Sequence, residues 1–459
     1  MMRTWPKLLR IGAILSLLAA LGAFLVRSAS AQTPPARPQR LSLGDAARFA
    51  AQQSAGVESA LQRVKEAEAR VTQRRADLLP NLSGAAAATR HTVNSATFGF
   101  DFPTPAGQPP LLDPNGQIIG PVKLLDFRGH GSQSLLDASA MARVRAARAA
   151  VVAAGADVTA AGEQAAATAA QAYLRSLRAD AQLEARIADS TLASDLLRIA
   201  RDQLTAGVGV GLDVTRSEAQ LAGVRAQLIA ARNDKNRSRL DLLRALNLPL
   251  DALIELTDSL GRMPSVDAVN EEAAVTQAIA NRPDIRAVAE QLRAAEAQVA
   301  AIRAERLPTI GVFGDDGVIG KNAEHLLGTY QLGLQVSVPI FDGFRREARM
   351  QEQQAAAREI DARRRDLRQQ VAVEVRSALL DLGSAREQVD AARERLRLGE
   401  QELAQARDRF AAGVAGNADV ITASLALNGA RNLLIDAETA YQAARVALAR
   451  AEGNLTQLR

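Results

Sequence analysis

The chain has 459 residues, is 47% hydrophobic but only 3% aromatic, carries a formal net charge of +5 and contains no cysteine. This composition excludes a thick core of large aromatic side chains, and it also excludes disulfides, a thiolate metal site and a lipid-modified cysteine. Four basic residues and no acid lie in the first 31 positions, so the rest of the chain keeps a charge of only +1 and we expect no nucleic acid partner.

The first 31 residues have the pattern of a secretory signal peptide. Arg3, Lys7 and Arg10 precede an apolar stretch at 11–26, and small residues at 29–31 form a cleavage site. We expect residues 1–31 to be removed and residues 32–40 to form an N-terminal linker. The alternative is an uncleaved membrane anchor, which is disfavoured because a spanning helix needs about 20 apolar residues.

Two parts of the chain are similar to each other, which predicts an internal repeat. RDQLTAGVGVGLDV at 201–214 returns as RDRFAAGVAGNADV at 407–420, and AEARVTQRRADLLP at 67–80 returns as AEAQVAAIRAERLP at 295–308. The first repeat is predicted to contain helices at 41–80, a β-hairpin at 81–133 and a helical hairpin at 134–248 that turns at 206–213. After a linker at 249–266, the second contains helices at 267–308, a β-hairpin at 309–341 and a helical hairpin at 342–459 that turns at 412–419.

Long helices dominate both repeats. Small and apolar residues recur at steps of three and four from Val375 to Phe410, as in a coiled-coil seam whose alanines let helices approach closely. The matching seam at 169–204 is more polar, with Arg186 as an outlier. The proline-free segments 134–206 and 342–412 would each reach roughly 110 Å at ~1.5 Å per residue. They must be broken or belong to a rod-like assembly.

The helical period stops at Pro80 and Pro308, and period-2 patterns follow. The clearest is YQLGLQVSVPI at 330–340, in which apolar residues alternate with small or polar ones, as in a strand with one face toward lipid. Residues 81–93 and 309–314 are weaker strand candidates, the latter followed early by two aspartates. The first hairpin is longer, and its proline-rich stretch at about 94–117 predicts an exposed loop.

Two hairpins provide only four strands, which cannot close a barrel. An open sheet edge in lipid leaves backbone groups unpaired at several kcal/mol each, and closed barrels begin at about eight strands. The missing strands must therefore come from other copies of the chain.

Together these features resemble the TolC-like outer-membrane efflux protein family. The resemblance rests on the signal, the repeats, the VPIFDGFRR junction at 338–346 and the paired turns around AGV and DV. It implies an α+β membrane protein whose protomer has two repeats of long coiled-coil α-helices and two β-hairpins. It further implies a homotrimer with a twelve-stranded β-barrel on an α-helical tunnel, in the outer membrane of a Gram-negative bacterium. Many relatives carry an acylated N-terminal cysteine, but this chain has no cysteine, so we expect it to be held by its barrel alone, without lipidation.

The implied function is the exit duct of a tripartite efflux or type I secretion system. Its expected partners are outer-membrane lipid, a periplasmic adaptor (membrane fusion protein) and an inner-membrane pump of the RND, ABC or MFS type. The duct is expected to be passive, since the chain has no energy-transducing motif. The competing hypothesis is a periplasmic coiled-coil scaffold or adaptor without a membrane barrel, which explains the seams but not the alternation at 330–340.

The resemblance also assigns site residues. Asp419 matches the carboxylate that rings the closed periplasmic entrance, where three copies would attract cations, and Asp213 is its counterpart in the first repeat. Thr422 stands where a second acidic ring is expected, and Phe410 replaces a tyrosine near the entrance. Asp419 as a plain helix cap is the alternative. The tip turns that an adaptor would grip contain Gly207, Val208, Gly413, Val414, Arg201 and Arg407, and the strand-to-helix junctions contain Asp137, Asp342 and Gly343.

Other site types find little support in the sequence. Gly207, Gly209 and Gly211 are spaced like part of a dinucleotide loop, but a long helix rather than a strand precedes them, so they are better explained as a helix-ending turn. No enzyme signature is present, and we expect no catalytic activity and no cofactor. His91, His130 and His325 are predicted to be solvated residues rather than metal ligands.

Overall fold

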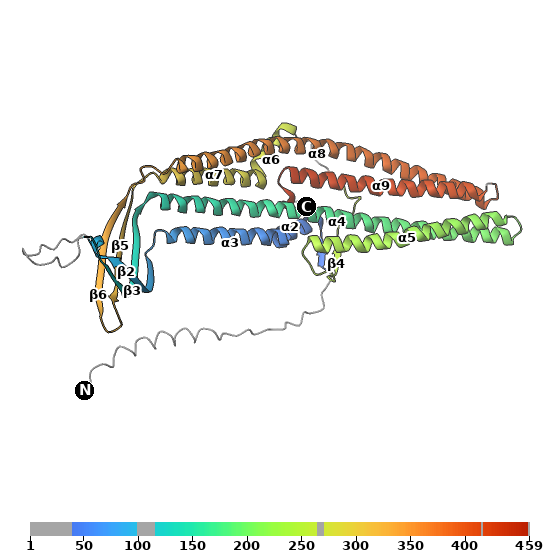
Figure 1. The fold of residues 1–459 in the computed structure, drawn as a ribbon. Helices are drawn as coiled ribbons and strands as arrows, with labels where there is room; N and C mark the ends of the chain where they lie inside the picture. Colours follow the sequence, from blue (N-terminus) through green and yellow to red (C-terminus); the bar gives the residue numbers. More distant parts are fainter. Residues whose placement is uncertain (1–38, 99–114, 264–269, 415, 458–459) are drawn as a thin grey trace, which may run out of the picture.

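The computed structural model describes residues 39–98, 115–263, 270–414 and 416–457. Figure 1 shows an elongated molecule, with a β-sheet at one end, long helices that run away from it, and two helical turns at the other end, which we call the tip. The predicted signal peptide, most of the linker at 32–40 and most of the proline-rich loop lie outside the described residues.

The same order of elements occurs twice along the chain. The first set is β1 (Gln39–Leu41), α2 (Leu43–Gln53), α3 (Ala55–Ala76), β2 (Asn81–Asn94), the 3-10 helix η1 (Ser95–Phe98), β3 (Ile118–Asp137), α4 (Ala138–Thr205) and α5 (Gly211–Ala245). The second set is β4 (Ile254–Leu256), α6 (Glu271–Asn281), α7 (Pro283–Ala304), β5 (Thr309–Gly320), β6 (Leu326–Ser337), α8 (Arg345–Ala411), α9 (Asn417–Ala451) and the 3-10 helix η2 (Leu455–Gln457). Each repeat thus has two helices, a hairpin, a long helix and a returning helix.

The long helices α4 and α8 are continuous. They contain 68 and 67 residues, which corresponds to roughly 100 Å each. Toward the sheet, α4 packs against α3 and α8 against α7; toward the tip, α4 packs against α5 and α8 against α9 (Figure 1). Because α4 also contacts α7 and α9, it joins the two repeats along most of its length. Among the described residues, no helix has both the length and the apolar composition needed to cross a membrane.

The predicted seam of α8 is its buried face. Val375 and Val389 are fully buried, and Ala378, Leu382 and Ala385 are at most 7% exposed. The part of this seam from Ala378 to Ala392 packs against buried residues of α9 that include Tyr441. Alanine at alternate seam positions leaves little side chain between the helices, so the two backbones lie close together along a narrow core.

The largest buried cluster lies at the middle of the molecule, where α2, α4, α5, α9 and η2 meet. The fully buried Tyr173 of α4 donates from its hydroxyl to the carbonyl of Leu41 and to Asp258 Oδ2, both at 3.0 Å. The same carboxylate accepts from the amide of Leu43 at 2.6 Å. Burial raises the pKa of Tyr173 above its ordinary range, so the hydroxyl remains a donor. This network fixes the parallel pair β1 and β4 beside α4.

Several boundaries differ from those predicted. Strand β3 continues to Asp137 rather than ending at 133, because the Asp137 side chain caps α4 and so sets the first helical residue at Ala138. Helix α8 begins at Arg345 rather than 342, because Gly343 and Phe344 have left-handed backbones with φ of 68° and 62°. Strand β6 ends at Ser337, two residues before Pro339, which has no amide proton to continue a ladder.

Parts of two predicted linkers form strands instead, and one predicted weak strand is longer than expected. Residues 39–40 of the N-terminal linker belong to β1, and residues 254–256 of the inter-repeat linker form β4. The strand predicted at 309–314 continues through Asp315 and Asp316 to Gly320. Asp315 fits within the sheet because Arg128 Nη1 of the neighbouring strand lies 3.1 Å from its carboxylate.

Candidate functional site at the sheet face and the helical tip

The four long strands form one antiparallel sheet in the order β2-β3-β5-β6. The central pair β3 and β5 joins the two repeats through register pairs such as Ser132 with Phe313. In the described chain, β2 and β6 are the outer strands, and each pairs with only one neighbour. Their outer backbone donors and acceptors are therefore free to pair with further strands.

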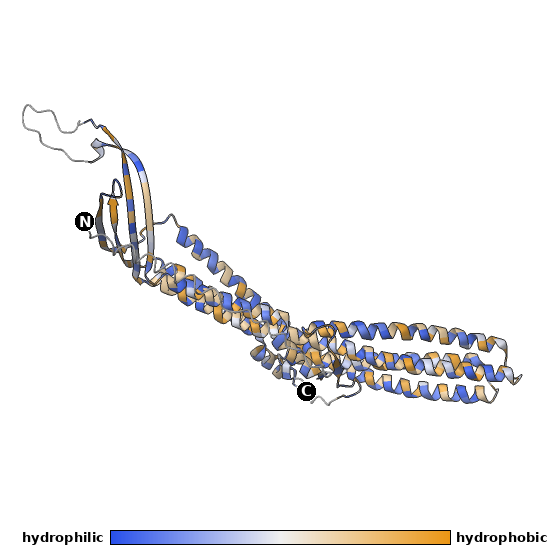
Figure 2. Ribbon diagram, turned by 90° about the horizontal axis from the view of Figure 1, so that it is seen from below, coloured by the Kyte–Doolittle hydropathy of each residue, from blue (hydrophilic) through white to orange (hydrophobic). Residues whose placement is uncertain are grey.

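One face of this sheet is apolar and exposed. The register aligns Leu82, Gly131, Gly314 and Leu332 in one row across all four strands. Leu82 is 83% exposed and Leu332 is 81% exposed, and hydrophobic and hydrophilic residues alternate along the strands in Figure 2. The same face carries Phe127, Val318, Leu334 and Val336, together with Asp316 and, further along β2 and β3, the register pair Arg90 and Lys123.

The opposite face is polar. Arg128 lies between two carboxylates, with its Nε 2.7 Å from Asp126 and its Nη1 3.1 Å from Asp315. Asp315 pairs in register with Gln331, and Ser83, Ser132 and Gln335 lie further along the same face, which also carries Phe313 and Ile319. A sheet with one exposed apolar face and one polar face is suited to separate lipid from water.

The predicted junction residues lie where the strands become helices. Asp137 Oδ1 accepts from the amide of Ala140 at 2.8 Å and from the hydroxyl of Ser139 at 2.7 Å, so it caps α4. Asp342 accepts from Arg346 Nε at 2.7 Å. Gly343, whose φ is 68°, provides the left-handed turn between this ion pair and α8.

The two tip turns have the same geometry. Gly207 and Gly413 have φ of 76° and 71°, and each donates to the carbonyl three residues earlier. The following valine amides, of Val208 and Val414, donate to the carbonyls of Gln203 and Arg409 at 3.1 and 2.9 Å. These paired bonds form a Schellman motif, which ends a helix with a left-handed glycine. It leaves the valine side chains 80% and 71% exposed.

The two predicted acids occupy equivalent positions after these turns. Asp213 is the third residue of α5 and Asp419 the third residue of α9, so both lie in a first helical turn, where a negative charge interacts favourably with the helix dipole. Neither acid is the N-cap, since Val210 and Gly416 hold those positions. The Asp419 side chain is exposed, and Asp213 lies 3.9 Å from Arg216 Nη1.

The remaining predicted tip residues are not gathered into one cluster within the chain. Phe410 is 3% exposed and packs with Leu196 and Val420 in an apolar core, so its ring is not presented at the surface. Thr422 donates to the carbonyl of Ala418 at 2.9 Å. Arg201 lies 2.6 Å from Glu218 and so links α4 to α5, and its counterpart Arg407 is exposed on α8.

Asn417 at the tip was not identified from the sequence. Its side chain is fully buried, and its Nδ2 donates to the carbonyl of Asp213 at 2.9 Å and to Ser217 Oγ at 2.7 Å. Since Asn417 begins α9 and Ser217 belongs to α5, this amide ties the two returning helices together. Gln203 makes a parallel link by donating from Nε2 to the carbonyl of Phe410 at 3.0 Å.

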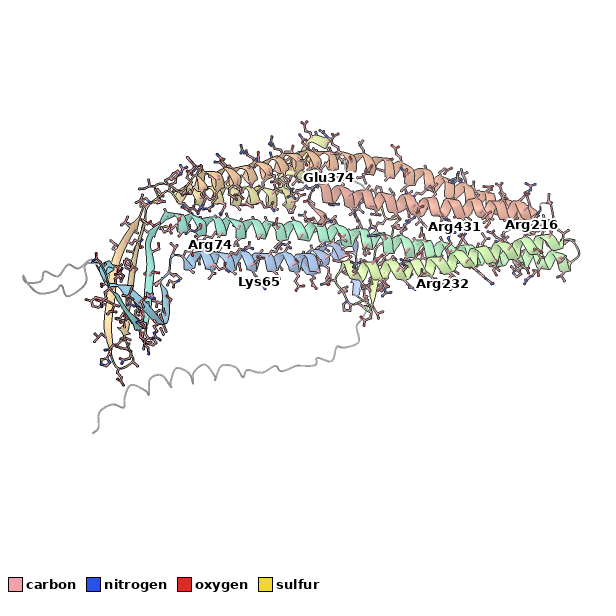
Figure 3. The ribbon with its side chains drawn as sticks, in the orientation of Figure 1. Lys65, Arg74, Arg216, Arg232, Glu374 and Arg431 are labelled. Atoms are coloured by element: carbon pink, nitrogen blue, oxygen red, sulfur yellow. The ribbon has the colours of Figure 1, made fainter. Side chains whose placement is uncertain are left out.

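A second feature missed from the sequence is a buried charge cluster between α4 and α9. The Asp189 side chain is 1% exposed and lies 3.0 Å from Arg186 Nη1 and 2.8 Å from Arg431 Nη1. Arg186 also donates to Asn432 Oδ1 at 2.9 Å, and Figure 3 marks Arg431 on α9. Burial raises the pKa of Asp189, and the neighbouring Arg431 and Arg186 offset part of this increase. The outlying Arg186 of the first seam thus pairs with a buried acid.

The family model for outer membrane efflux proteins matches residues 47–248 and 274–454, which together cover most of the chain. The chain belongs to the outer membrane efflux protein family. The two matched segments correspond to the two repeats, and the gap between them contains β4 and the linker around it. The predicted family is therefore confirmed, and the molecule is a mainly helical α+β member of it.

Individual relatives are distant. The alkaline protease secretion protein AprF of Pseudomonas aeruginosa is 25% identical over 67% of this chain and 65% of its own length. The outer membrane efflux protein BepC of Brucella suis is 28% identical over 59% of this chain and 60% of its own. The chain thus aligns with less than two thirds of either relative. The solved outer membrane protein VceC of Vibrio cholerae has the same fold, with a TM-score of 0.70 at 20% identity, covering 90% of this chain and 96% of that one.

Proposed function

We propose that this protein is the outer-membrane exit duct of a tripartite efflux or type I secretion system. It would conduct substrates passively from a periplasmic adaptor and an inner-membrane pump to the exterior. The observation that carries the proposal is the exposed apolar sheet face, which stands at one end of helices roughly 100 Å long. Large exposed apolar patches mark contact with protein or membrane, and the scaffold hypothesis does not explain the alternation that produces this face. The names of AprF and BepC, which refer to secretion and to outer membrane efflux, support the same proposal.

The duct is proposed to be a homotrimer. Four strands cannot close a barrel, and the outer edges of β2 and β6 in the described chain need partners if the sheet lies in lipid. Joining β6 of one copy to β2 of the next would give twelve strands from three copies, an even number as in other bacterial barrels. The polar face with Arg128 would then line the lumen, and the helices below would form the tunnel.

The tip is proposed as the docking surface for the adaptor, which in turn engages a pump of the RND, ABC or MFS type. Val208 and Val414 are exposed by two equivalent Schellman turns, so the tip presents two similar apolar knobs per chain. Arg201 and Arg407 stand at corresponding positions, seven residues before the two valines. A surface that repeats the same apolar knob is suited to a partner that binds both turns in the same way.

Asp419 is proposed as the gate residue of the tunnel entrance. Its exposed carboxylate stands in the first turn of α9 at the tip, where a three-fold axis would bring three copies together. Like charges in a narrow passage repel one another and attract cations. Asp213, Thr422 and the buried Phe410 would shape this entrance, Phe410 through packing rather than direct contact.

Single-channel recording in planar bilayers tests the proposed duct and the proposed gate residue Asp419. The purified oligomer should form ion-conducting pores that divalent cations block from the tip side. Asp419→Ala should raise the conductance several-fold and weaken the block, whereas Asp234→Ala, which removes an exposed acid from the middle of α5, should change neither. An intact trimer that conducts no ions would refute the duct, and an Asp419→Ala pore with unchanged conductance and block would refute the gate alone.

A further inference from the structure

Charge is unevenly distributed between the two ends of the molecule. Four segments flank the places where strands and helices meet: residues 74–80, 137–145, 302–308 and 342–349. Together they hold nine arginines and five acids, a net charge of +4. At the tip, by contrast, residues 194–218 and 403–423 hold five basic and six acidic residues, a net charge of −1. The basic excess therefore belongs to the sheet end.

All five acids near the junctions already have a partner. Arg143 lies 3.8 Å from Asp77 and 3.6 Å from Asp137. The other three pairs have distances between 2.7 and 2.9 Å: Arg306 with Glu347, Arg346 with Asp342, and Arg349 with Glu305. These pairs use four arginines and leave no acid of the four segments unpaired.

Five arginines remain, and we call them the junction collar: Arg74, Arg75, Arg145, Arg303 and Arg345. All five are exposed, and within the described chain none forms a salt bridge. Arg74 and Arg75 end α3, Arg303 lies in the last turn of α7, and Arg345 begins α8. Figure 3 marks Arg74 near the sheet end of the molecule.

The collar stands directly beside the apolar sheet face. Val336 on that face lies nine positions before Arg345 in the sequence. The exposed rings of Phe341 and Phe344 come between them in the chain and are in edge-to-face contact, with centroids 5.4 Å apart. The apolar face is proposed to lie among the acyl chains. The aromatic rings at its border with the helices, and the charged residues that follow them, then fall at the level of the lipid headgroups.

We propose that the junction collar binds anionic phospholipid headgroups of the periplasmic leaflet, so that the protein prefers anionic over neutral lipid around its sheet. This inference rests on the proposed placement of the sheet in the membrane. Guanidinium groups match phosphate in charge and in hydrogen-bond geometry. Five exposed arginines that form no salt bridge within the described chain offer such groups near the sheet, and juxtamembrane basic clusters attract anionic leaflets.

The test measures which lipid the purified full-length protein retains. Delipidated protein is equilibrated with mixed micelles of phosphatidylcholine and phosphatidylglycerol in equal amounts, repurified, and its bound phospholipid is quantified by mass spectrometry. We expect a roughly three- to five-fold enrichment of phosphatidylglycerol at 0.05 M salt, which falls toward none at 0.5 M because salt screens exposed charges.

Two triple variants provide the matched comparison. Arg74→Gln/Arg75→Gln/Arg345→Gln should lose most of the enrichment. Arg225→Gln/Arg232→Gln/Arg237→Gln removes the same charge from exposed, unpaired arginines of α5 far from the sheet, and it should retain the enrichment (Figure 3 marks Arg232). Equal loss in both variants, or no enrichment in the wild-type chain at low salt, would overturn the collar. If a variant fails to fold, the effect of salt on phosphatidylglycerol enrichment in the wild-type chain still tests the collar.

Insertion is scored separately, by flotation with vesicles of phosphatidylcholine alone followed by washing in alkaline urea. Wild-type protein that inserts but retains both lipids equally would overturn the collar and leave the duct intact. Protein that inserts into no vesicle would refute the membrane sheet, and with it both proposals.

Discussion

Removal of the buried carboxylate between α4 and α9 is predicted to loosen the joint between the two repeats near the tip. Asp189→Ala would leave Arg186 and Arg431 facing each other without the acid that now lies 3.0 and 2.8 Å from them. The amide of Asn428, oriented with its nitrogen toward the carboxylate, also donates to Asp189 Oδ1 at 2.5 Å. All three groups would lose a partner at once.

The expected cost follows from burial. Breaking a buried ion pair by deleting one member costs about 3–5 kcal/mol. The two guanidinium groups are 18% and 27% exposed and can recover some hydration, so we expect about 2–4 kcal/mol of local stability. A similar pair between the same two helices, Arg178 with Asp436 at 2.7 Å, is 43% and 51% exposed. Asp436→Ala should therefore cost less than about 1 kcal/mol.

Native-state hydrogen exchange measures this difference directly, since global unfolding of the proposed trimer would not give a single free energy. Amides of α9 around Arg431 should exchange about 30- to 900-fold faster in Asp189→Ala, and less than about five-fold faster in Asp436→Ala. Replacing Arg186, Asp189 and Arg431 together by Met, Leu and Met should restore most of the protection, because no charge is then left unpaired. Equal exchange in Asp189→Ala and Asp436→Ala would refute the reasoning.

Two further predictions concern the tip and the helices near the middle of the molecule. Gly207→Ala and Gly413→Ala force alanine into a left-handed backbone and should each destabilise the tip by about 1–2 kcal/mol. The measurement is faster hydrogen exchange of the last helical turn. Gly211→Ala is the control, because Gly211 lies outside the left-handed region, and this variant should be neutral or stabilising. Burial tends to raise the pKa of Asp284, but hydrogen bonds from Arg282 outweigh it and lower the pKa below its ordinary 3.8. The stability from this pair should thus be present above pH 4 and lost as the pH falls through the lower folded-state value. Asp284→Asn should make the melting temperature less sensitive to acid between pH 4 and 2, and an unchanged acid sensitivity would contradict the assignment.

The repeat architecture could be predicted because its signals are local and periodic. The α8 seam from Val375 to Phe410 follows helical spacing, and the alternation around Leu332 follows strand spacing, so each identifies a buried or an apolar face without knowledge of its partner. The tip turns were predictable for a related reason, since the glycines recur at equivalent positions in both repeats and glycine is the residue that ends helices in a left-handed turn.

The features that could not be predicted depend on contacts between residues far apart in the sequence. Asp189 meets Arg431 across 242 positions, and nothing near either residue in the sequence indicates that pairing. Asn417 resembles any polar helix-start residue until the fold places it against Ser217 of another helix. The ends of β3 and β5 were misplaced because a cap at Asp137 and an ion pair at Asp315 decide them, and both override the local pattern.

The proposed duct depends most directly on which face of the sheet meets lipid. Trp5, in the predicted signal peptide, is the only tryptophan, so a Trp5→Phe chain can carry a single reporter. Leu332→Trp lies on the apolar face and Gln331→Trp on the polar face of the same strand. In vesicles, tryptophan at 332 should emit at shorter wavelength and be quenched by brominated acyl chains, whereas tryptophan at 331 should be quenched by aqueous iodide. Quenching by iodide at both positions, with no effect of brominated lipid at 332, would contradict the membrane-spanning sheet and the duct built on it.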